Sequence, residues 1–345
     1  MKCIRPTYIN DFKCDGKKCG SRCCKGWQVT VDNETYQKYC EIDEIMSQLE
    51  PADNDLHFVK MQDDFKCPFL DGDSLCKIQK QYGEEYLTKI CHSYPRVNYR
   101  LGDVLEQSLT LTCPVAAKLI LLPTEPMQFE VVEIDKPRAV FEWTDKLDLP
   151  LVEALDLQEF SISILQDRTL NLNMRLFKLC VLLCGEDNLK LQNDFDINKH
   201  AQMMIDIFCE MYNADMDERK KINLQSTYIS YRDVILSRLM KDYNNIFENY
   251  IVNEFFMRCY PFAFAGGIWT NCKIFITSVK AMEFAIILTA ISKNGVVSVD
   301  EFLMMIDAVN EKLDHNRGGM KAIIKLSDEI IDFKSFIDYM IYVSI

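Results

Sequence analysis

The sequence predicts an α+β protein, predominantly α-helical, with a cysteine-rich, metal-binding N-terminal part of a few short strands packed on a C-terminal helical region. Nine of the 15 cysteines fall between residues 14 and 113. After Pro150, apolar residues recur at intervals of three and four, the spacing of a buried helix face. The stretch between these parts is rich in proline. We therefore predict domains at 1–122 and 151–345, joined by a linker at 123–150.

In the N-terminal part, local patterns predict each element in turn. Residues 27–32 alternate and are β-branched, which indicates a strand. Asp32 and Asn33 then supply capping chemistry for a helix over 33–40. A turn at Asp71-Gly72-Asp73 folds the chain back, so that Cys67 and Cys76 can face each other. Further predicted elements are a helix over 78–87 that ends before Pro95, a hairpin over 100–112 with its return strand at 106–112, and a strand over 127–134 inside the linker.

Helical periodicity continues to the end of the chain. The most apolar segment, residues 274–291, contains Lys280 and Glu283, which favours a buried helix over a membrane span. We therefore predict no membrane insertion. Further helices are predicted over residues 299–312, 321–326 and 333–343.

The charge of the chain limits its partners. A net charge of −13 and a pI near 4.9 argue against nucleic acid as the principal ligand, because phosphate binding needs a basic face. Residues 1–25 are nevertheless basic. This run is either a solvated surface or a source of positive charge that lowers the pKa of nearby thiols.

A dense group of cysteines needs either disulfides or a bound metal. Residues 1–8 show no apolar signal segment, so we expect a cytoplasmic location, where thiols stay reduced and clustered cysteines more often bind metal. No CxxC pair occurs here, and irregular spacing favours an iron–sulfur cluster of the 4Fe–4S type, with zinc as the alternative. The predicted ligands are Cys14, Cys19, Cys23, Cys24, Cys67, Cys76, Cys91 and Cys113.

Cys113 carries the strongest individual argument for a ligand. It immediately precedes Pro114, which is a preferred first residue of a helix, and the apolar residues 115–122 follow. A thiolate at this position gains from the free N–H groups and the positive end of the helix dipole. Cys40 and the cysteines after residue 150 lack such a context, and we expect them to pack in the core as small hydrophobic residues.

The cysteine pattern resembles that of the flagellin lysine N-methylase family. The resemblance extends into the helical half and covers most of the chain. The residues that carry it are Phe12, Cys14, Cys19, Cys23-Cys24, Gly26-Trp27, Cys67, Phe69-Leu70, Leu75-Cys76, Cys91, Tyr94-Pro95-Arg96, Leu111, Cys113-Pro114, Asn249-Tyr250, Val252-Asn253, Phe256 and Tyr260-Pro261-Phe262.

The resemblance implies a protein-lysine N-methyltransferase that acts on flagellin, with S-adenosylmethionine as the methyl donor. No glycine-rich loop follows a strand, so an ordinary Rossmann-type donor site cannot be located. Tyr94 and Glu106 are candidate catalytic residues beside the cysteine motifs, because an aromatic or acidic pocket can hold the developing charge. Trp27 and Arg96 are candidate cofactor-binding residues. Each of these side chains also has a purely structural interpretation.

Two other functions remain open from the sequence. The chain could be a non-catalytic iron- or zinc-binding protein, since eight clustered cysteines need no reaction to explain them. It could also be an adaptor that binds flagellin through its helical part, while another protein performs the chemistry.

Overall fold

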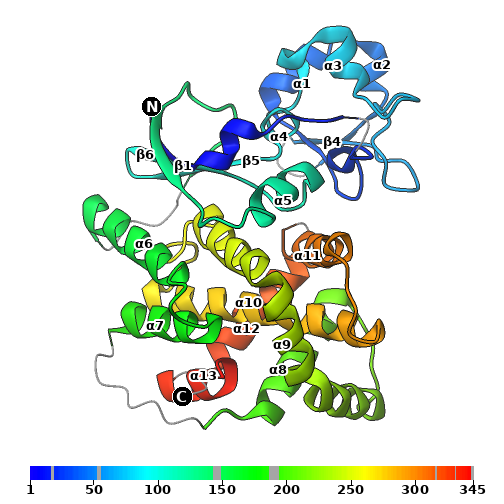
Figure 1. Cartoon of the computed structure of the whole chain (residues 1–345). Helices are drawn as coiled ribbons and strands as arrows, with labels where there is room; N and C mark the ends of the chain where they lie inside the picture. Colours follow the sequence, from blue (N-terminus) through cyan, green and yellow to red (C-terminus); the bar gives the residue numbers. More distant parts are fainter. Residues whose placement is uncertain are drawn as a thin grey trace. The chain divides into compact units, whose positions relative to one another are not determined.

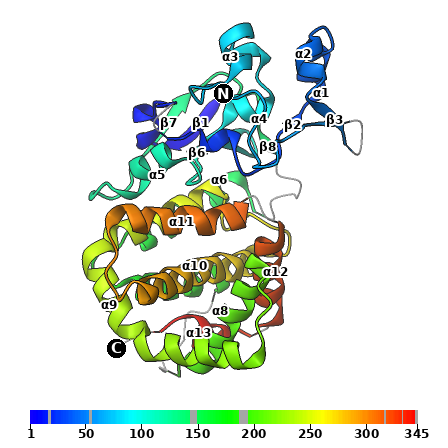
Figure 2. The same cartoon turned by 90° about the vertical axis from the view of Figure 1, so that its right-hand side faces the viewer.

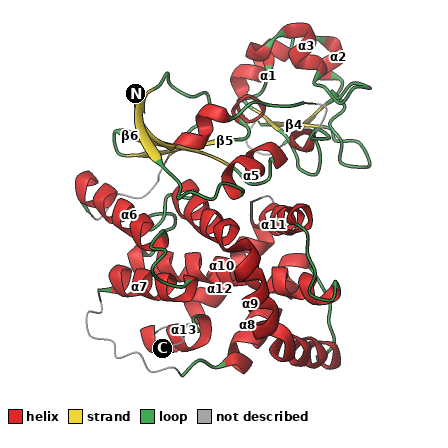
Figure 3. Ribbon diagram, viewed as in Figure 1, coloured by secondary structure: helices red, strands yellow, loops and turns green. Residues whose placement is uncertain are grey.

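The computed structural model describes residues 1–16, 19–52, 56–142, 149–185, 194–314, 317–330 and 332–342. The chain forms two compact units (Figure 1). The first unit comprises Met1–Leu119 and Gln128–Trp143, and the helical unit comprises Ile120–Met127 and Thr144–Ile345. All described strands belong to the first unit, as Figure 3 shows. The predicted α+β class is confirmed.

A mixed five-stranded sheet forms one part of the first unit. Its strand order is β7-β1-β6-β5-β8, with β1 parallel to β6 and β5 parallel to β8. The predicted hairpin is present as β5 and β6, although the return strand begins at Val104 rather than at residue 106. Gly102 makes the turn with φ of +58°, a conformation that favours glycine. The strands are β1 Lys2–Pro6, β5 Arg96–Leu101, β6 Val104–Leu109, β7 Phe129–Glu133 and β8 Phe141–Glu142.

A smaller sheet and short helices form the rest of the first unit. The predicted strand over residues 27–32 is reduced to β2, Thr30–Val31, which pairs with β4. The predicted helix after Asp32 is confirmed as α1, and the Asp32 carboxylate accepts a hydrogen bond from Thr35 N. The elements are β2, β3 Leu49–Pro51, β4 His57–Val59, α1 Asn33–Tyr39, α2 Asp43–Met46, α3 Lys77–Tyr82 and α4 Lys89–Ser93, with three short 3₁₀ turns, Thr7–Asp11, Arg22–Cys24 and Glu84–Tyr86.

The predicted continuous helix over residues 78–87 is wrong. The α-helix α3 ends at Tyr82, and a 3₁₀ turn over Glu84–Tyr86 follows. Gly83 separates the two with φ of +93° and ψ of 173°, which no helix contains. The break lets the chain change direction before α4, which carries Cys91.

The proline-rich segment 123–150 contributes to both units. Its N-terminal end belongs to the helical unit, whereas β7 and β8 join the sheet of the first unit. The predicted strand over residues 127–134 is present as β7. The helix predicted at Pro114 is present as α5, Pro114–Leu121.

The helical unit is assembled around α10, Gly267–Ser292 (Figures 1 and 2). The helices α7, α8, α9, α11, α12 and α13 all contact α10. Its length and composition would allow it to cross a membrane, but 83% of its most apolar window is buried inside the structure. The other helices are α6 Leu151–Leu165, α7 Leu172–Cys184, α8 Ile197–Tyr212, α9 Glu218–Met257, α11 Val299–Asp314, α12 Arg317–Glu329 and α13 Phe333–Met340.

Two buried ion-pair networks join these helices. On α10, Lys280 Nζ lies 2.8 Å from Glu283 Oε2 and donates to Asn173 of α7. On α9, the buried Glu248 accepts from two arginines, with Arg175 Nη1 at 2.6 Å and Arg168 Nη2 at 2.8 Å. Each charge is paired, which is what makes its burial tolerable.

We expect Glu248→Ala to destabilise the helical unit by about 3–5 kcal/mol, because it leaves the buried guanidinium of Arg175 without its carboxylate partner. Calorimetric unfolding measures the change. The matched control is Glu210→Ala, whose pair with Lys325 is exposed on both sides and should contribute no more than about 1 kcal/mol. Equal losses in the two variants would show that the Glu248 network adds no special stability.

Candidate functional site: a cluster of thiols

Seven of the eight predicted ligand cysteines interact electrostatically in the first unit. Cys23 is at the centre of this group, because its charge raises the pKa of Cys24, Cys67, Cys76, Cys91 and Cys113. Cys19 joins through its effect on Cys113. We call this group the thiol cluster: Cys19, Cys23, Cys24, Cys67, Cys76, Cys91 and Cys113. The eighth residue, Cys14, is exposed.

Backbone pairing brings the first two segments of the thiol cluster together. The 3₁₀ turn Arg22–Cys24 holds Cys23 and Cys24. Cys67 N then donates to Cys24 O at 2.9 Å, and Gly26 N donates to Phe65 O at 3.0 Å. These bonds fix two stretches that are about forty residues apart in sequence.

The predicted turn between Cys67 and Cys76 is confirmed. Asp71 Oδ1 accepts from Asp73 N at 2.8 Å and from Leu75 N at 2.9 Å. Lys80 Nζ lies 2.6 Å from Asp71 Oδ2 and, together with the backbone donor of Leu75, lowers the pKa of Asp71 to about 2. The ionised carboxylate therefore holds the turn that folds Cys76 back towards Cys67.

Two thiols of the cluster lie just before helices and receive backbone donors. The N–H groups of Ala116 and Val115 point to the Cys113 thiol at the start of α5, as the position before Pro114 predicts. Cys76, the residue before α3, receives the N–H groups of Gln79 and Ile78 in the same way. Such donors favour the thiolate.

Burial works against these donors. It raises the pKa of both Cys67 and Cys113 to about 11 and that of Cys91 to about 12, and neighbouring thiolate charges add to the effect. The Thr88 hydroxyl, which caps α4, partly offsets the shift at Cys91. A bound cation would reverse the balance, because metal ligation stabilises the thiolate form.

Cys23 and Cys24 lie within reach of a thiol hydrogen bond. Their sulfur atoms lie 3.8 Å apart, and the hydrogen bond from Cys24 lowers the pKa of Cys23 to about 7 while the pKa of Cys24 rises. Two sulfurs at ~2.3 Å from one tetrahedral ion lie about 3.8 Å apart, so this separation would suit a shared ion.

The metal itself stays a prediction. Within the described ranges, no three cysteine, histidine or carboxylate side chains already converge on one metal-sized point. The donor set nevertheless has the chemistry of a metal–thiolate site, namely gathered sulfurs, backbone N–H donors and partial burial. His92, a further conceivable ligand, has Nε2 3.9 Å from Glu84 Oε1, and burial lowers its pKa.

The candidate catalytic and cofactor residues are split between two places. Trp27 and Tyr94 stack with ring centroids 6.2 Å apart, and Trp27 Nε1 donates to Cys23 O, so this pair lies beside the thiol cluster. The Tyr94 hydroxyl lies 3.3 Å from Thr112 Oγ1. Glu106 is instead buried in β6, where its charge raises the pKa of Cys3. The Arg96 guanidinium covers the Phe12 ring at 5.3 Å.

For the cysteines outside the thiol cluster, burial depends on their position on the nearest helix. Cys180 and Cys272 are buried with their sulfurs 3.6 Å apart, in agreement with the predicted core packing. Cys40 was expected to be a buried hydrophobe, which is wrong: it follows α1 and is exposed. Its position just after the final helical residue, Tyr39, turns it away from the face that Tyr39 buries.

The sequence interpretation missed two features. Thr88 caps the helix of Cys91, and the Thr-x-x-Cys spacing of an N-cap could have indicated it. A cavity among α8, α10 and α11 had no sequence signal, because three helices distant in sequence form it.

Comparison with known proteins relates the helical unit to a family. Residues 191–340 match the model described as "FliB lysine N-methylase C-terminal domain". The "Flagellar biosynthetic protein FliU" of Salmonella muenchen is 31% identical over 132 residues, which cover 35% of this chain and 78% of that protein. No solved structure matches significantly.

Two curated relatives are much longer than the matched region. The proteins named "Lysine-N-methylase" from Salmonella typhimurium (strain LT2) and Salmonella choleraesuis (strain SC-B67) are each 32% identical over 132 residues. In both, the match spans 33% of the relative and 35% of this chain. The chain thus matches about a third of the length of these two relatives.

We expect Cys76→Ser and Cys113→Ser each to lose most of the bound metal, because each removes a sulfur whose N–H donors favour the thiolate. Elemental analysis of anaerobically purified protein, with its visible absorption spectrum, measures the loss. Cys40→Ser is the matched control and should retain the metal, because Cys40 is exposed after α1. Full metal content in both variants would contradict this ligand set. A colourless protein with stoichiometric zinc would show that the bound metal is zinc and not an iron–sulfur cluster.

Proposed function

Because this chain belongs to the FliB lysine N-methylase family, we propose that it is a protein-lysine N-methyltransferase that acts on flagellin. The observation that carries the proposal is the match of residues 191–340, a range that contains α8 to α13, to the C-terminal domain of lysine N-methylases. The names of the relatives, which combine flagellar biosynthesis with lysine methylation, support flagellin as the substrate. A reducing cytoplasm is the proposed location, since the described cysteines are all free thiols.

We propose S-adenosylmethionine as the methyl donor. The lysine nitrogen must first lose a proton, because its pKa in water is ~10.4 and only the neutral amine has a lone pair. That lone pair then forms a bond to the methyl carbon as the carbon–sulfur bond breaks, and the electron pair of that bond goes to sulfur. The products are methyl-lysine, S-adenosylhomocysteine and the released proton. Desolvation of the ammonium or a nearby base can supply the first step.

For the thiol cluster we propose a 4Fe–4S cluster, with zinc as the alternative. Cys67, Cys76, Cys91 and Cys113 are proposed ligands because their thiols receive backbone or hydroxyl donors, and Cys23 is a further one because it lies at the centre of the thiol cluster. When bound, the metal centre would link the segments that carry these thiols covalently and compensate their negative charge. Metal binding at such a site contributes directly to the free energy of folding.

The aromatic pair beside the thiol cluster is the proposed contact for a cationic group. Trp27 and Tyr94 supply aromatic rings, the kind of group to which a lysine ammonium or a sulfonium is attracted. Glu106 is less suited to this role, because it is buried in β6 beside Cys3 rather than beside Cys23. Of the two candidate catalytic residues, Tyr94 is therefore the one that we assign to the substrate.

Mass spectrometry of flagellin tests the proposed reaction. We expect the metal-loaded protein to add mass increments of one methyl group to flagellin lysines, and only when S-adenosylmethionine is present. Tyr94→Phe keeps the ring and should reduce activity less than Tyr94→Ala does. If the ring face holds a cation, the Phe variant should be about tenfold more active than the Ala variant.

The same assay distinguishes the proposed reaction from the two alternative functions that the sequence left open. A metal-binding protein without catalytic activity would retain iron or zinc and leave flagellin unmodified. A flagellin-binding adaptor would hold flagellin and give methylated lysines only after a second protein is added. Either outcome would overturn the proposed reaction.

A further inference from the structure

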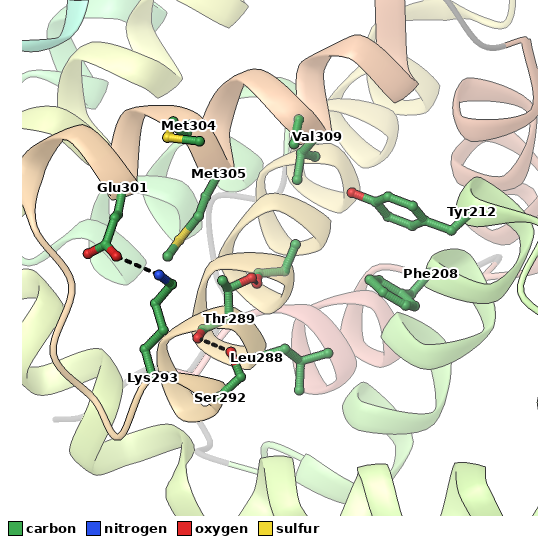
Figure 4. A pocket seen from close by; sticks show the side chains of 12 residues that line it. Phe208, Tyr212, Leu288, Thr289, Ser292, Lys293, Glu301, Met304, Met305 and Val309 are labelled. Atoms are coloured by element: carbon green, nitrogen blue, oxygen red, sulfur yellow. Dashed lines mark hydrogen bonds and ion pairs between the residues drawn. The ribbon is translucent and has the colours of Figure 1, made fainter.

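The helical unit contains a cavity of about 480 Å³ among α8, α10 and α11 (Figure 4). Every residue that lines it lies within residues 191–340, the part that matches the lysine N-methylase domain. Its volume falls within the ~300–1,000 Å³ of pockets that bury a small-molecule ligand. The lining residues are Phe208, Tyr212, Ala285, Leu288, Thr289, Ser292, Lys293, Glu301, Met304, Met305, Ala308 and Val309.

One end of the cavity is aromatic and apolar. Phe208 and Tyr212 lie on one turn of α8 with ring centroids 4.6 Å apart, and Figure 4 shows them facing Leu288 and Val309. Met305 adds a side chain that adapts to the shape of a ligand. Such a surface is suited to a flat heteroaromatic ring.

The other end carries two opposite charges. Lys293 Nζ lies 2.5 Å from Glu301 Oε1, while Ser298 N and Ser298 Oγ hold Glu301 Oε2 at 2.8 and 2.9 Å. Lys293 and the Ser298 donors lower the pKa of Glu301 to about 2, so the carboxylate stays ionised. Both side chains are about 40% exposed, and an exposed pair of this kind opens at little cost.

Hydroxyl groups lie between the two ends. Thr289 Oγ1 donates to Ala285 O at 2.9 Å, and Ser292 Oγ donates to Thr289 O at 2.7 Å. Each hydroxyl uses its proton within α10, so its oxygen is left to accept. These oxygens can accept hydrogen bonds from an amino or hydroxyl group of a ligand.

We propose that this cavity binds the methyl donor, with the adenosyl group between Phe208 and Leu288 and the amino-acid end on Lys293 and Glu301. The amino-acid end is a zwitterion, so its carboxylate matches Lys293 and its ammonium matches Glu301. An acceptor lysine carries only one positive charge and offers no negative group for Lys293 to bind. The inference rests on the proposed function, and it assigns the donor to the helical unit rather than to Trp27 and Arg96 of the first unit.

Calorimetric titration of the metal-loaded full chain with S-adenosylhomocysteine tests the site. Ala308→Trp should weaken binding at least tenfold, because the new ring fills the cavity from an exposed position on α11. Val234→Trp is the matched control: it adds the same ring at an exposed position on α9 that does not line the cavity, and should leave binding unchanged. Undiminished binding by Ala308→Trp would overturn the inference.

A second ligand tests the charged end separately. Lys293→Met and Glu301→Gln should each weaken S-adenosylhomocysteine about tenfold, the loss of one charge-assisted hydrogen bond. Both should leave the affinity for methylthioadenosine unchanged, since that nucleoside lacks the amino-acid group. Glutamine at position 301 can still form the capping box with Ser298, so the N-terminal end of α11 should be preserved. Equal losses for both ligands would contradict the proposed orientation.

Methylation by the wild-type chain distinguishes this inference from the proposed function. If flagellin is methylated while Ala308→Trp binds the nucleoside normally, the proposed function stands and the donor site is wrong. If Ala308→Trp abolishes nucleoside binding but the wild-type chain methylates nothing, the site stands and the proposed reaction fails.

Discussion

Burial of α10 on nearly every side is the constraint on which the helical unit depends. A helix this apolar is stable in water only where other helices cover it, and six of them do. The same burial forces Lys280 and Glu283 to pair, because neither charge could be buried alone. Leu288 and Thr289, on its C-terminal part, are only half-buried, and it is there that the cavity opens against α8 and α11.

In the first unit, the main physical constraint is the close approach of several cysteine thiols. Burial and mutual repulsion raise the pKa of the Cys67 and Cys91 thiols, while helix N–H groups at Cys76 and Cys113 favour the charged form. These opposing effects leave a set of sulfurs that gains most from a cation. A metal that links several of the segments that carry these sulfurs would add its binding free energy to the stability of this unit.

Local chemistry made much of the candidate site predictable. The Asp71 turn follows from its Asp-Gly-Asp sequence, and the position of Cys113 follows from Pro114. Glu106 could not be placed in this way. Its neighbours are set by the pairing of β1 with β6, which joins residues about a hundred positions apart and buries it beside Cys3. The long helix expected over residues 78–87 failed for a local reason, since Gly83 adopts a backbone conformation that no helix contains.

The sequence by itself determined the α+β class, the helices of the C-terminal half, the hairpin and most of the cysteines that the structure brings together. It could do so because helix periodicity, caps and turns depend on residues a few positions apart. Only the tertiary structure decided that Cys23 lies at the centre of the thiol cluster, that β7 and β8 complete the first unit's sheet, and that α8, α10 and α11 leave a cavity between them. These features arise from contacts between segments distant along the chain, and no local pattern encodes which distant surfaces meet.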